Sequence, residues 1–141
     1  MKPNTPTSPT SPALPVEVVR QFYDALKCGD APAALSLLNC ELEWTEADRF
    51  PYYSGTWRSP EEVLNKLLIP LMRDWDAFSA VPHEFISEGD RVASIGAYSG
   101  TFKTTGKKMN APFVHTWTVR DGRITKFDMC VDSAKVLETM H

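Results

Sequence analysis

Residues 111–132 constrain the fold of this chain more than any other stretch. Two strand-like runs flank Asp121-Gly122, and an Asp-Gly step between alternating segments is a strong signal for a β-hairpin. Successive side chains of a strand point to opposite faces, so alternate residues of the first arm share one face. That face carries Ala111, Phe113, His115, Trp117 and Val119. The pattern therefore places a single histidine in the middle of an apolar and aromatic row.

The second arm of the hairpin carries two carboxylates. Asp128 and Asp132 have the same parity as Ile124 and Cys130, and a charge buried without a partner is costly. One interpretation is that Asp132 orients His115, as carboxylates do beside catalytic or metal-binding histidines. The other is that Asp132 caps a short C-terminal helix that follows it. We expect Asp128 to be exposed to solvent.

Length and charge limit the class of protein. The chain has 141 residues, 43% of them hydrophobic and 23% charged, which suits one soluble domain with a core. Its net charge is −3 without any block of like charge, whereas nucleic-acid readers concentrate Lys and Arg. We therefore expect no nucleic-acid partner.

The cysteines and the apolar runs favour a cytoplasmic protein. Three cysteines without a C-x-x-C pair argue against a disulfide framework and a zinc site, and favour a reducing compartment. The first fifteen residues lack the apolar core of a signal peptide. The most apolar run, "LLIPLM", is too short to span a bilayer and contains Pro70. We expect no membrane attachment and no metal.

Residues 1–15 differ in composition from the rest of the chain. Proline recurs at every third position from Pro3 to Pro15, with Ser and Thr between. Proline lacks the backbone donor that a sheet needs and favours extended polyproline II geometry. The sequence predicts a disordered leader over residues 1–15 and a single folded domain over residues 16–141. The alternative is a P-x-x-P ligand that recruits a partner protein.

Three helices are predicted in the N-terminal half. Apolar residues recur at intervals of three and four over residues 16–26, and this helix ends near Gly29. A second helix, with an Asp N-cap and a proline in its first turn, follows over residues 30–39. The sequence Ser-Pro-Glu-Glu at residues 59–62 is a capping box that starts the third helix. That helix should end or kink before Pro70.

The remaining segments are strand-like. Leu42, Trp44 and Glu46 alternate with polar residues, which predicts a short strand with a carboxylate on its aromatic face. Further strands are predicted over residues 76–88 and 91–102, ahead of the hairpin. Helices first and antiparallel strands afterwards indicate an α+β protein, with the helices packed on one face of a bent sheet.

Taken together, several segments resemble one known family. They are the two linked N-terminal helices, "EWTEADRFPYYSGTW", the capped third helix, "ISEGDRV" and "APFVHTWTVRDGRITKF". In order and spacing they are similar to the SnoaL-like, or nuclear transport factor two-like, superfamily, which includes ketosteroid isomerase-like enzymes; the resemblance covers residues 16–140. It implies a cone in which a curved antiparallel sheet, closed by three helices, surrounds a pocket. It also implies a small organic ligand and a homodimer formed through the open sheet face.

The resemblance also implies roles for individual residues. Glu46 falls where ketosteroid isomerases keep their general-base carboxylate, and His115 falls where they keep the group that donates to the substrate oxyanion. Phe22 falls where they keep a donor tyrosine, so that hydroxyl is missing here. Asp132, with Asp128 as a rival, lies where SnoaL-type cyclases carry a catalytic aspartate. The implied catalytic set is thus His115, Glu46 and Asp132, working without a cofactor or metal.

The chemistry of these side chains fits such a role. An aromatic pocket desolvates a carboxylate and raises its pKa, which makes it a better base near neutral pH. Histidine donates or accepts a proton in the same range. The alternative interpretation places Glu46 at an exposed strand end. It makes His115 a core residue that hydrogen-bonds Asp132 or the Trp44 backbone.

Aromatic residues are the candidate ligand-binding set, because flat apolar walls suit a cyclic organic ligand. The set is Trp44, Phe50, Tyr52, Trp57, Tyr98, Phe113 and Trp117. A core role suits the same residues equally, and Tyr52 or Tyr98 could replace the missing hydroxyl. The predicted function is a cofactor-independent isomerase, cyclase or dehydratase that acts on a small apolar or cyclic molecule. The alternatives are a ligand carrier or sensor without turnover and a dimeric protein-interaction domain.

Overall fold

The computed structural model describes residues 13–141. Most of the predicted proline-rich leader therefore lies outside the described residues, and Pro15 is the first residue of helix α1 (Pro15–Lys27). This helix buries Val18, Val19, Phe22 and Tyr23. They form the apolar stripe that the spacing of the first predicted helix indicates.

The second helix, α2 (Ala31–Ser36), is shorter than the predicted residues 30–39. Its end is set by the sheet, because Leu38 is already paired with Ile124 on another strand. The Ile124 N–H also donates to the Leu37 carbonyl at 2.8 Å. Sheet pairing has overridden the local helical pattern at this boundary.

The sequence predicted that the third helix ends or kinks before Pro70, and the first of these alternatives was wrong, because the helix does not end there. It runs from α3 (Pro60–Val63) through a π-helical turn, η1 (Leu64–Leu68), into α4 (Ile69–Asp74). The Ile69 N–H donates to the Leu64 carbonyl, five residues back. A wider turn at this point relieves the clash between a proline ring and the preceding turn. Helical structure therefore continues past the proline.

Six strands form one curved sheet in the order β2-β1-β6-β5-β4-β3. The strands are β1 (Leu38–Thr45), β2 (Thr56–Trp57), β3 (Trp75–Glu88), β4 (Arg91–Phe102), β5 (Lys108–Arg120) and β6 (Arg123–Val131). Neighbouring strands are antiparallel as expected, except that β1 and β6 run parallel. The mixed α+β architecture with a curved sheet is confirmed.

The predicted hairpin joins β5 to β6. Asp121 and Gly122 have φ values of 52° and 76°, as a two-residue hairpin turn requires. The predicted row of β5, from Ala111 to Val119, is buried. We call this side of the sheet the inner face and the opposite side the outer face.

The predicted parity of β6 was wrong at one point. Thr118 pairs with Lys126 but Val119 pairs with Ile124, so the register shifts by one residue. Such a bulge moves the following side chains to the other face. Ile124 therefore lies in the core at 0% exposure, whereas Asp128 is opposite Thr116 on the outer face.

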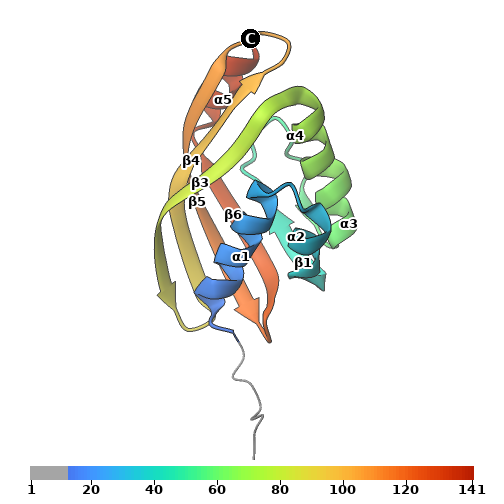
Figure 1. The fold of residues 1–141 in the computed structure, drawn as a ribbon, viewed down its shortest axis with the longest axis vertical. Helices are drawn as coiled ribbons and strands as arrows, with labels where there is room; N and C mark the ends of the chain where they lie inside the picture. Colours follow the sequence, from blue (N-terminus) through green and yellow to red (C-terminus); the bar gives the residue numbers. More distant parts are fainter. Residues whose placement is uncertain (1–12) are drawn as a thin grey trace, which may run out of the picture.

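The helices cover the inner face (Figure 1). Helix α1 lies across it in contact with β3, β4, β5 and β6, while α3 and α4 flank it near β1 and β3. The C-terminal helix α5 (Ser133–Met140) packs on β5 and β4. It is tied to the β4–β5 hairpin, since the Thr105 hydroxyl donates to the Thr139 carbonyl at 2.6 Å. A space remains between the helices and the inner face.

Candidate functional site

That space is a cavity of about 540 Å³ between α1, the helix of residues 60–74 and the inner face of the sheet. Its walls are mostly aromatic and aliphatic. The buried ionisable side chains in its wall are Tyr23, Glu46, Tyr98 and His115, each no more than 6% exposed. An apolar cavity with a few convergent polar groups is the usual form of a small-molecule site.

His115 projects from the middle of β5 and is 3% exposed. Its Nδ1 lies 2.5 Å from the Tyr23 hydroxyl, and its Nε2 lies 2.6 Å from the Tyr98 hydroxyl. The ring stacks on Phe113, with centroids 3.9 Å apart. Burial holds the pKa of His115 well below its usual range, so the ring is neutral near pH 7. Neither Asp132 nor the Trp44 backbone is a partner of the ring.

Tyr23 connects His115 to a second buried pair. The Tyr23 hydroxyl lies 2.6 Å from Ser94 Oγ, and the Trp117 Nε1–H donates to the same Oγ at 2.9 Å. Ser94 is 0% exposed. Burial raises the pKa of Tyr23 above its usual value, so this hydroxyl stays protonated at neutral pH.

Tyr98 stands on β4, beside His115 and at the cavity wall. Its ring is surrounded by the rings of Phe50, Phe78 and Phe113. Burial raises the pKa of Tyr98 well above its usual value, and the nearby Glu46 raises it further. The Tyr98 hydroxyl is therefore a neutral group that can donate or accept a hydrogen bond.

Glu46 directly follows β1 and is 4% exposed, so it is not at a solvent-exposed strand end. The Trp44 Nε1–H donates to its Oε2 at 2.8 Å. Within residues 13–141 the carboxyl group has no other hydrogen-bond partner. Burial raises the pKa of Glu46 to about 7, against the opposing effect of the Trp44 hydrogen bond. Glu46 thus changes charge near neutral pH.

The two aspartates of the second hairpin arm lie away from the cavity. Asp132 is exposed and caps α5, accepting a hydrogen bond from the Lys135 backbone N–H at 3.3 Å. This is the second interpretation of Asp132 given by the sequence. Asp128 is half-buried on the outer face rather than exposed. Neither carboxylate contacts His115.

The seven aromatic candidates divide into two groups. Four of them line the cavity: Trp44, Phe50, Tyr98 and Trp117. The other three serve the surrounding structure. Phe113 stacks behind His115, and the Trp57 Nε1–H donates to Ser54 Oγ at 2.7 Å. Tyr52 donates to Asp74 Oδ2 at 2.8 Å, and burial raises the pKa of its hydroxyl to about 12.

Sequence reasoning missed two members of the site. Phe22 lines the cavity without a hydroxyl, as expected, but the next residue, Tyr23, supplies a hydroxyl to His115. A tyrosine within the buried stripe of the first helix was the available signal. Ser94 was also overlooked, although it alternates with Val92 and Tyr98 on the inner face. A small polar residue in such a row is the corresponding signal.

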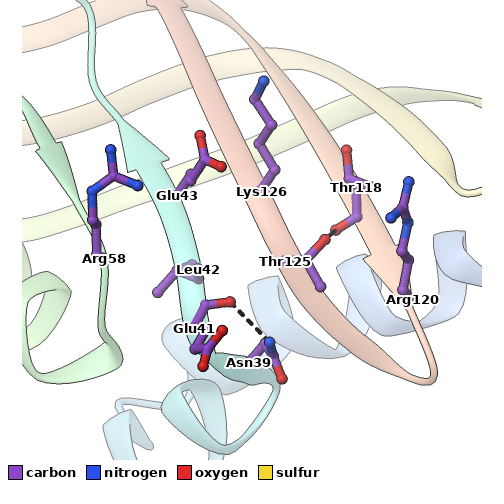
Figure 2. Close-up of a pocket in the computed structure, with 9 residues that line it drawn as sticks. All are labelled: Asn39, Glu41, Leu42, Glu43, Arg58, Thr118, Arg120, Thr125 and Lys126. Carbon is purple, nitrogen blue, oxygen red and sulfur yellow. Dashed lines mark hydrogen bonds between the residues drawn. The ribbon is translucent and has the colours of Figure 1, made fainter.

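A second hollow, of about 660 Å³, lies on the outer face across β1, β6 and β5. Figure 2 shows Glu43, Lys126 and Thr118 side by side there, with Arg58 beyond β1 and Arg120 at the end of β5. Its charged side chains are exposed and of mixed sign. It lacks the buried acid–base groups of the inner cavity.

Within residues 13–141, no three His, Cys, Asp or Glu side chains come together as metal ligands would. No helix in this part of the chain is both long and apolar enough to cross a bilayer.

The fold and site define a class of protein: a cone-shaped α+β domain with an internal cavity and buried acid–base groups. Residues 19–127 match the SnoaL-like domain family, and the chain belongs to this family. It is also similar to an NTF2-like protein from Burkholderia thailandensis, at 31% identity over 92% of this chain and 98% of the other, with a TM-score of 0.87.

Two more distant structures share the fold. TerC, crystallised with polyporic acid, is 24% identical over 89% of this chain and 97% of its own, with a TM-score of 0.78. IdmH from Streptomyces antibioticus, a proposed polyketide cyclase, is 18% identical over 91% of this chain and 99% of its own, with a TM-score of 0.78. No curated protein gives a significant match.

Proposed function

We propose that this protein is a cofactor-independent acid–base enzyme of the isomerase, cyclase or dehydratase type, acting on a small, largely apolar carbonyl compound. One observation carries the proposal. Glu46, a buried carboxyl with a pKa of about 7, lines the same cavity as the hydroxyl of Tyr98, which is hydrogen-bonded to His115. A base and a neutral donor facing one apolar space are the groups that enolate chemistry needs.

In the proposed reaction, Glu46 removes a proton from the carbon next to a carbonyl group. The electron pair of the C–H bond forms the enolate, whose oxygen accepts a hydrogen bond from Tyr98. Glu46 then returns the proton to another carbon, which isomerises the substrate, or the enolate carbon attacks a second carbonyl, which closes a ring and leaves an alkoxide that takes the proton from Glu46. In a dehydration, the enolate electrons expel a β-hydroxyl group, which leaves as water with the proton from Glu46. Burial serves the reaction because it keeps Glu46 basic near neutral pH and excludes competing water.

The cavity walls support an apolar ligand. Trp44, Phe50 and Trp117 offer flat surfaces, and about 540 Å³ is within the range of small-molecule pockets. The crystallisation of TerC with polyporic acid shows that a protein of this fold has been observed with an organic acid. We therefore expect a cyclic or polycyclic carbonyl compound to fit this chain.

The test is a ligand screen followed by turnover assays on the compounds that bind. Glu46→Gln keeps the shape and the Trp44 hydrogen bond but removes the base, so turnover should fall at least about 100-fold with little loss of binding. The matched control is Glu43→Gln, the same change at an exposed site on the outer face. If Glu46→Gln turns over the same compounds at the rate of the parent, the acid–base mechanism is wrong.

A carrier without turnover is the second candidate, and one observation favours it. Both ring nitrogens of His115 already have partners inside the protein, so the ring is held without a ligand. A carrier needs the cavity but not the base. It is supported if compounds bind with a measurable dissociation constant, none is converted, and Glu46→Gln binds them equally.

We also propose that the chain forms a homodimer through the outer face of its sheet. Val81, Ile86 and Val114 on this face are between 38% and 55% exposed. The register places Ile95 opposite Val114, and Ala97 opposite Val81. Exposed apolar side chains gathered on one sheet face favour a protein partner over solvent.

A further inference from the structure

Five side chains, from Trp117 to Tyr98, form a continuous chain of hydrogen bonds beside the cavity. From the Trp117 end, Trp117 Nε1 is 2.9 Å from Ser94 Oγ, which is 2.6 Å from the Tyr23 hydroxyl. The Tyr23 hydroxyl is 2.5 Å from His115 Nδ1, and His115 Nε2 is 2.6 Å from the Tyr98 hydroxyl. Tyr23, Tyr98, His115 and Trp117 line the cavity, whereas Ser94 does not and is 0% exposed.

With the Tyr23 proton placed between Tyr23 and one of its two partners, Ser94 or His115, the chain has two possible directions. In the outward direction, Ser94 donates to Tyr23, Tyr23 donates to Nδ1 of His115, and the ring donates from Nε2 to Tyr98. In the inward direction, Tyr98 donates to Nε2, the ring donates from Nδ1 to Tyr23, and Tyr23 donates to Ser94. The direction decides which tautomer the neutral ring adopts.

Ser94, which is fully buried and does not line the cavity, decides between them. An indole N–H can only donate a hydrogen bond, so Trp117 donates to Ser94 Oγ and cannot accept from it. In the inward direction Ser94 accepts twice, and its own proton has no acceptor among the described residues, at a site with 0% exposure. A buried donor without an acceptor is disfavoured by about tenfold or more in population.

The outward direction leaves no such defect. The donor protons of Trp117, Ser94, Tyr23 and His115 then all have acceptors, and only the hydroxyl proton of Tyr98 has none within the chain of hydrogen bonds. His115 is the only hydrogen-bond partner of that hydroxyl within residues 13–141, and Tyr98 lines the cavity. The unpaired proton therefore faces the space where a ligand would lie.

We infer that His115 carries its proton on Nε2 and that Tyr98 consequently presents a hydrogen-bond donor to the cavity. This donor selects ligands that place a hydrogen-bond acceptor, such as a ketone or enolate oxygen, next to Tyr98. Tyr98 is thus a specificity-determining residue, and His115 acts through it as a positioning residue. The ligand preference rests on the proposed function, because it takes the cavity as the ligand site. The tautomer of His115 does not.

The tautomer is tested by nitrogen NMR of the ligand-free protein, labelled in its histidine rings. His83 and His141 are exposed and provide solvent-averaged reference signals from the same sample. We expect His115 to show a protonated Nε2 and an unprotonated Nδ1. The reverse assignment, or equal population of both forms, overturns the inference whatever the protein binds.

The ligand preference is tested with three bicyclic probes. The first is α-tetralone, which accepts hydrogen bonds but cannot donate them. The second is tetralin, which can neither accept nor donate, and the third is indole, which donates through its N–H. We expect α-tetralone to bind at least about tenfold more tightly than tetralin, and Tyr98→Phe to abolish that difference. Tyr53→Phe, at a 41% exposed tyrosine, should preserve it.

The outcomes separate the two proposals. Equal affinity for α-tetralone and tetralin, or a preference for indole that Tyr98→Phe removes, overturns the donor role of Tyr98. Failure of all three probes to bind counts against the ligand site of the proposed function, and the NMR result then decides the direction of the chain by itself.

Discussion

Glu46 occupies an unusual environment for a carboxylate. It sits in an aromatic wall at 4% exposure, and its pKa is raised to about 7. A single indole N–H at 2.8 Å compensates only part of the lost hydration. The group is therefore protonated for much of the time at neutral pH, and the same carboxyl can take up and return a proton within one reaction cycle.

Glu46 should make the folded state less stable as pH rises. Its pKa is about 7 in the folded protein and 4.5 in an unfolded chain, so between these values only the unfolded state releases the proton. Below pH 4.5 this ionisation costs the folded state nothing. As pH rises from 4.5 through 7, the free energy of unfolding falls by about 3 kcal/mol in total. Glu46→Gln should remove this dependence.

The measurement is the free energy of unfolding in urea, for the parent and Glu46→Gln, at several pH values across this window. Subtracting the two curves removes the separate effect of His115, whose lowered pKa destabilises the protein on the acid side. Glu43→Gln is the control and should follow the parent. Parallel curves for parent and Glu46→Gln would contradict the raised pKa.

The same ionisation should control activity. Only the ionised form of Glu46 accepts a proton, so kcat/KM for a converted substrate should rise with pH around a midpoint of about 7. His115 stays neutral over this range because burial lowers its pKa. A kcat/KM that is flat between pH 5.5 and 8.5 would argue against Glu46 as the base.

Alternation along a strand was enough to predict which face His115 and its aromatic neighbours share. The pairing of His115 with Tyr23 was not predictable in this way, because the two lie 92 residues apart and meet only when α1 packs on β5. Strand alternation predicted that Glu46 lies on the same face as Trp44. It could not predict that Glu46 is buried, because burial depends on the segment around Phe50 and on the third helix.

At the scale of elements, substitutions of Asp132 test whether its carboxylate is structural or catalytic. Asp132→Ala removes the cap of α5 and should cost about 1 kcal/mol of stability, whereas Asp132→Asn keeps a capping oxygen and should cost little. Neither change should reduce kcat, since Asp132 lies outside the cavity. A large loss of kcat in Asp132→Asn with stability retained would restore the catalytic interpretation.

Gly96 is required where β4 meets β3. A Cβ at this position would lie 2.1 Å from the Val81 carbonyl oxygen and 2.8 Å from Pro82 Cα, both of them backbone atoms. Gly96→Ala should therefore destabilise the protein by about 1–3 kcal/mol, as overpacking does. Ser99→Ala, at an exposed site of the same strand, is the control. Thermal unfolding of the two variants measures the difference.

Local signals predicted elements well but missed their limits. The Asp-Gly turn and the Ser59 capping box gave the right hairpin and helix start. The end of α2 was missed because β6 pairs with Leu38, and the π turn ahead of Pro70 was missed because such a turn is not visible in composition. For α2 the deciding contact, with Ile124 on β6, lies far away in the sequence.

At the scale of the whole molecule, the parallel pairing of β1 with β6 closes one side of the cone. It places Trp44 beside Phe127 on the inner face, with ring centroids 3.9 Å apart. This pairing carries Glu46, which follows β1, to the cavity wall. The sequence indicated the curved sheet and its helices, but a parallel partner for β1 is a long-range pairing without a local signature.

The proposed dimer is testable at its centre. Val114→Lys places a charge in the middle of the apolar outer face and should raise the dimer dissociation constant at least about tenfold, since burying an unpaired charge is costly. Gln21→Lys, on the exposed side of α1, is the control. Sedimentation of the two variants and the parent measures this. A monomeric parent, or a Val114→Lys protein that dimerises normally, would refute the outer-face interface.

The bond between Trp44 and Glu46 has an optical consequence. When the carboxyl group ionises, a negative charge appears 2.8 Å from the indole nitrogen, and the environment of that ring becomes more polar. Tryptophan emission should therefore shift to longer wavelength around pH 7 in the parent and remain constant in Glu46→Gln. The protein thus carries a fluorescent reporter of its own proposed base, which can be read before any substrate is known.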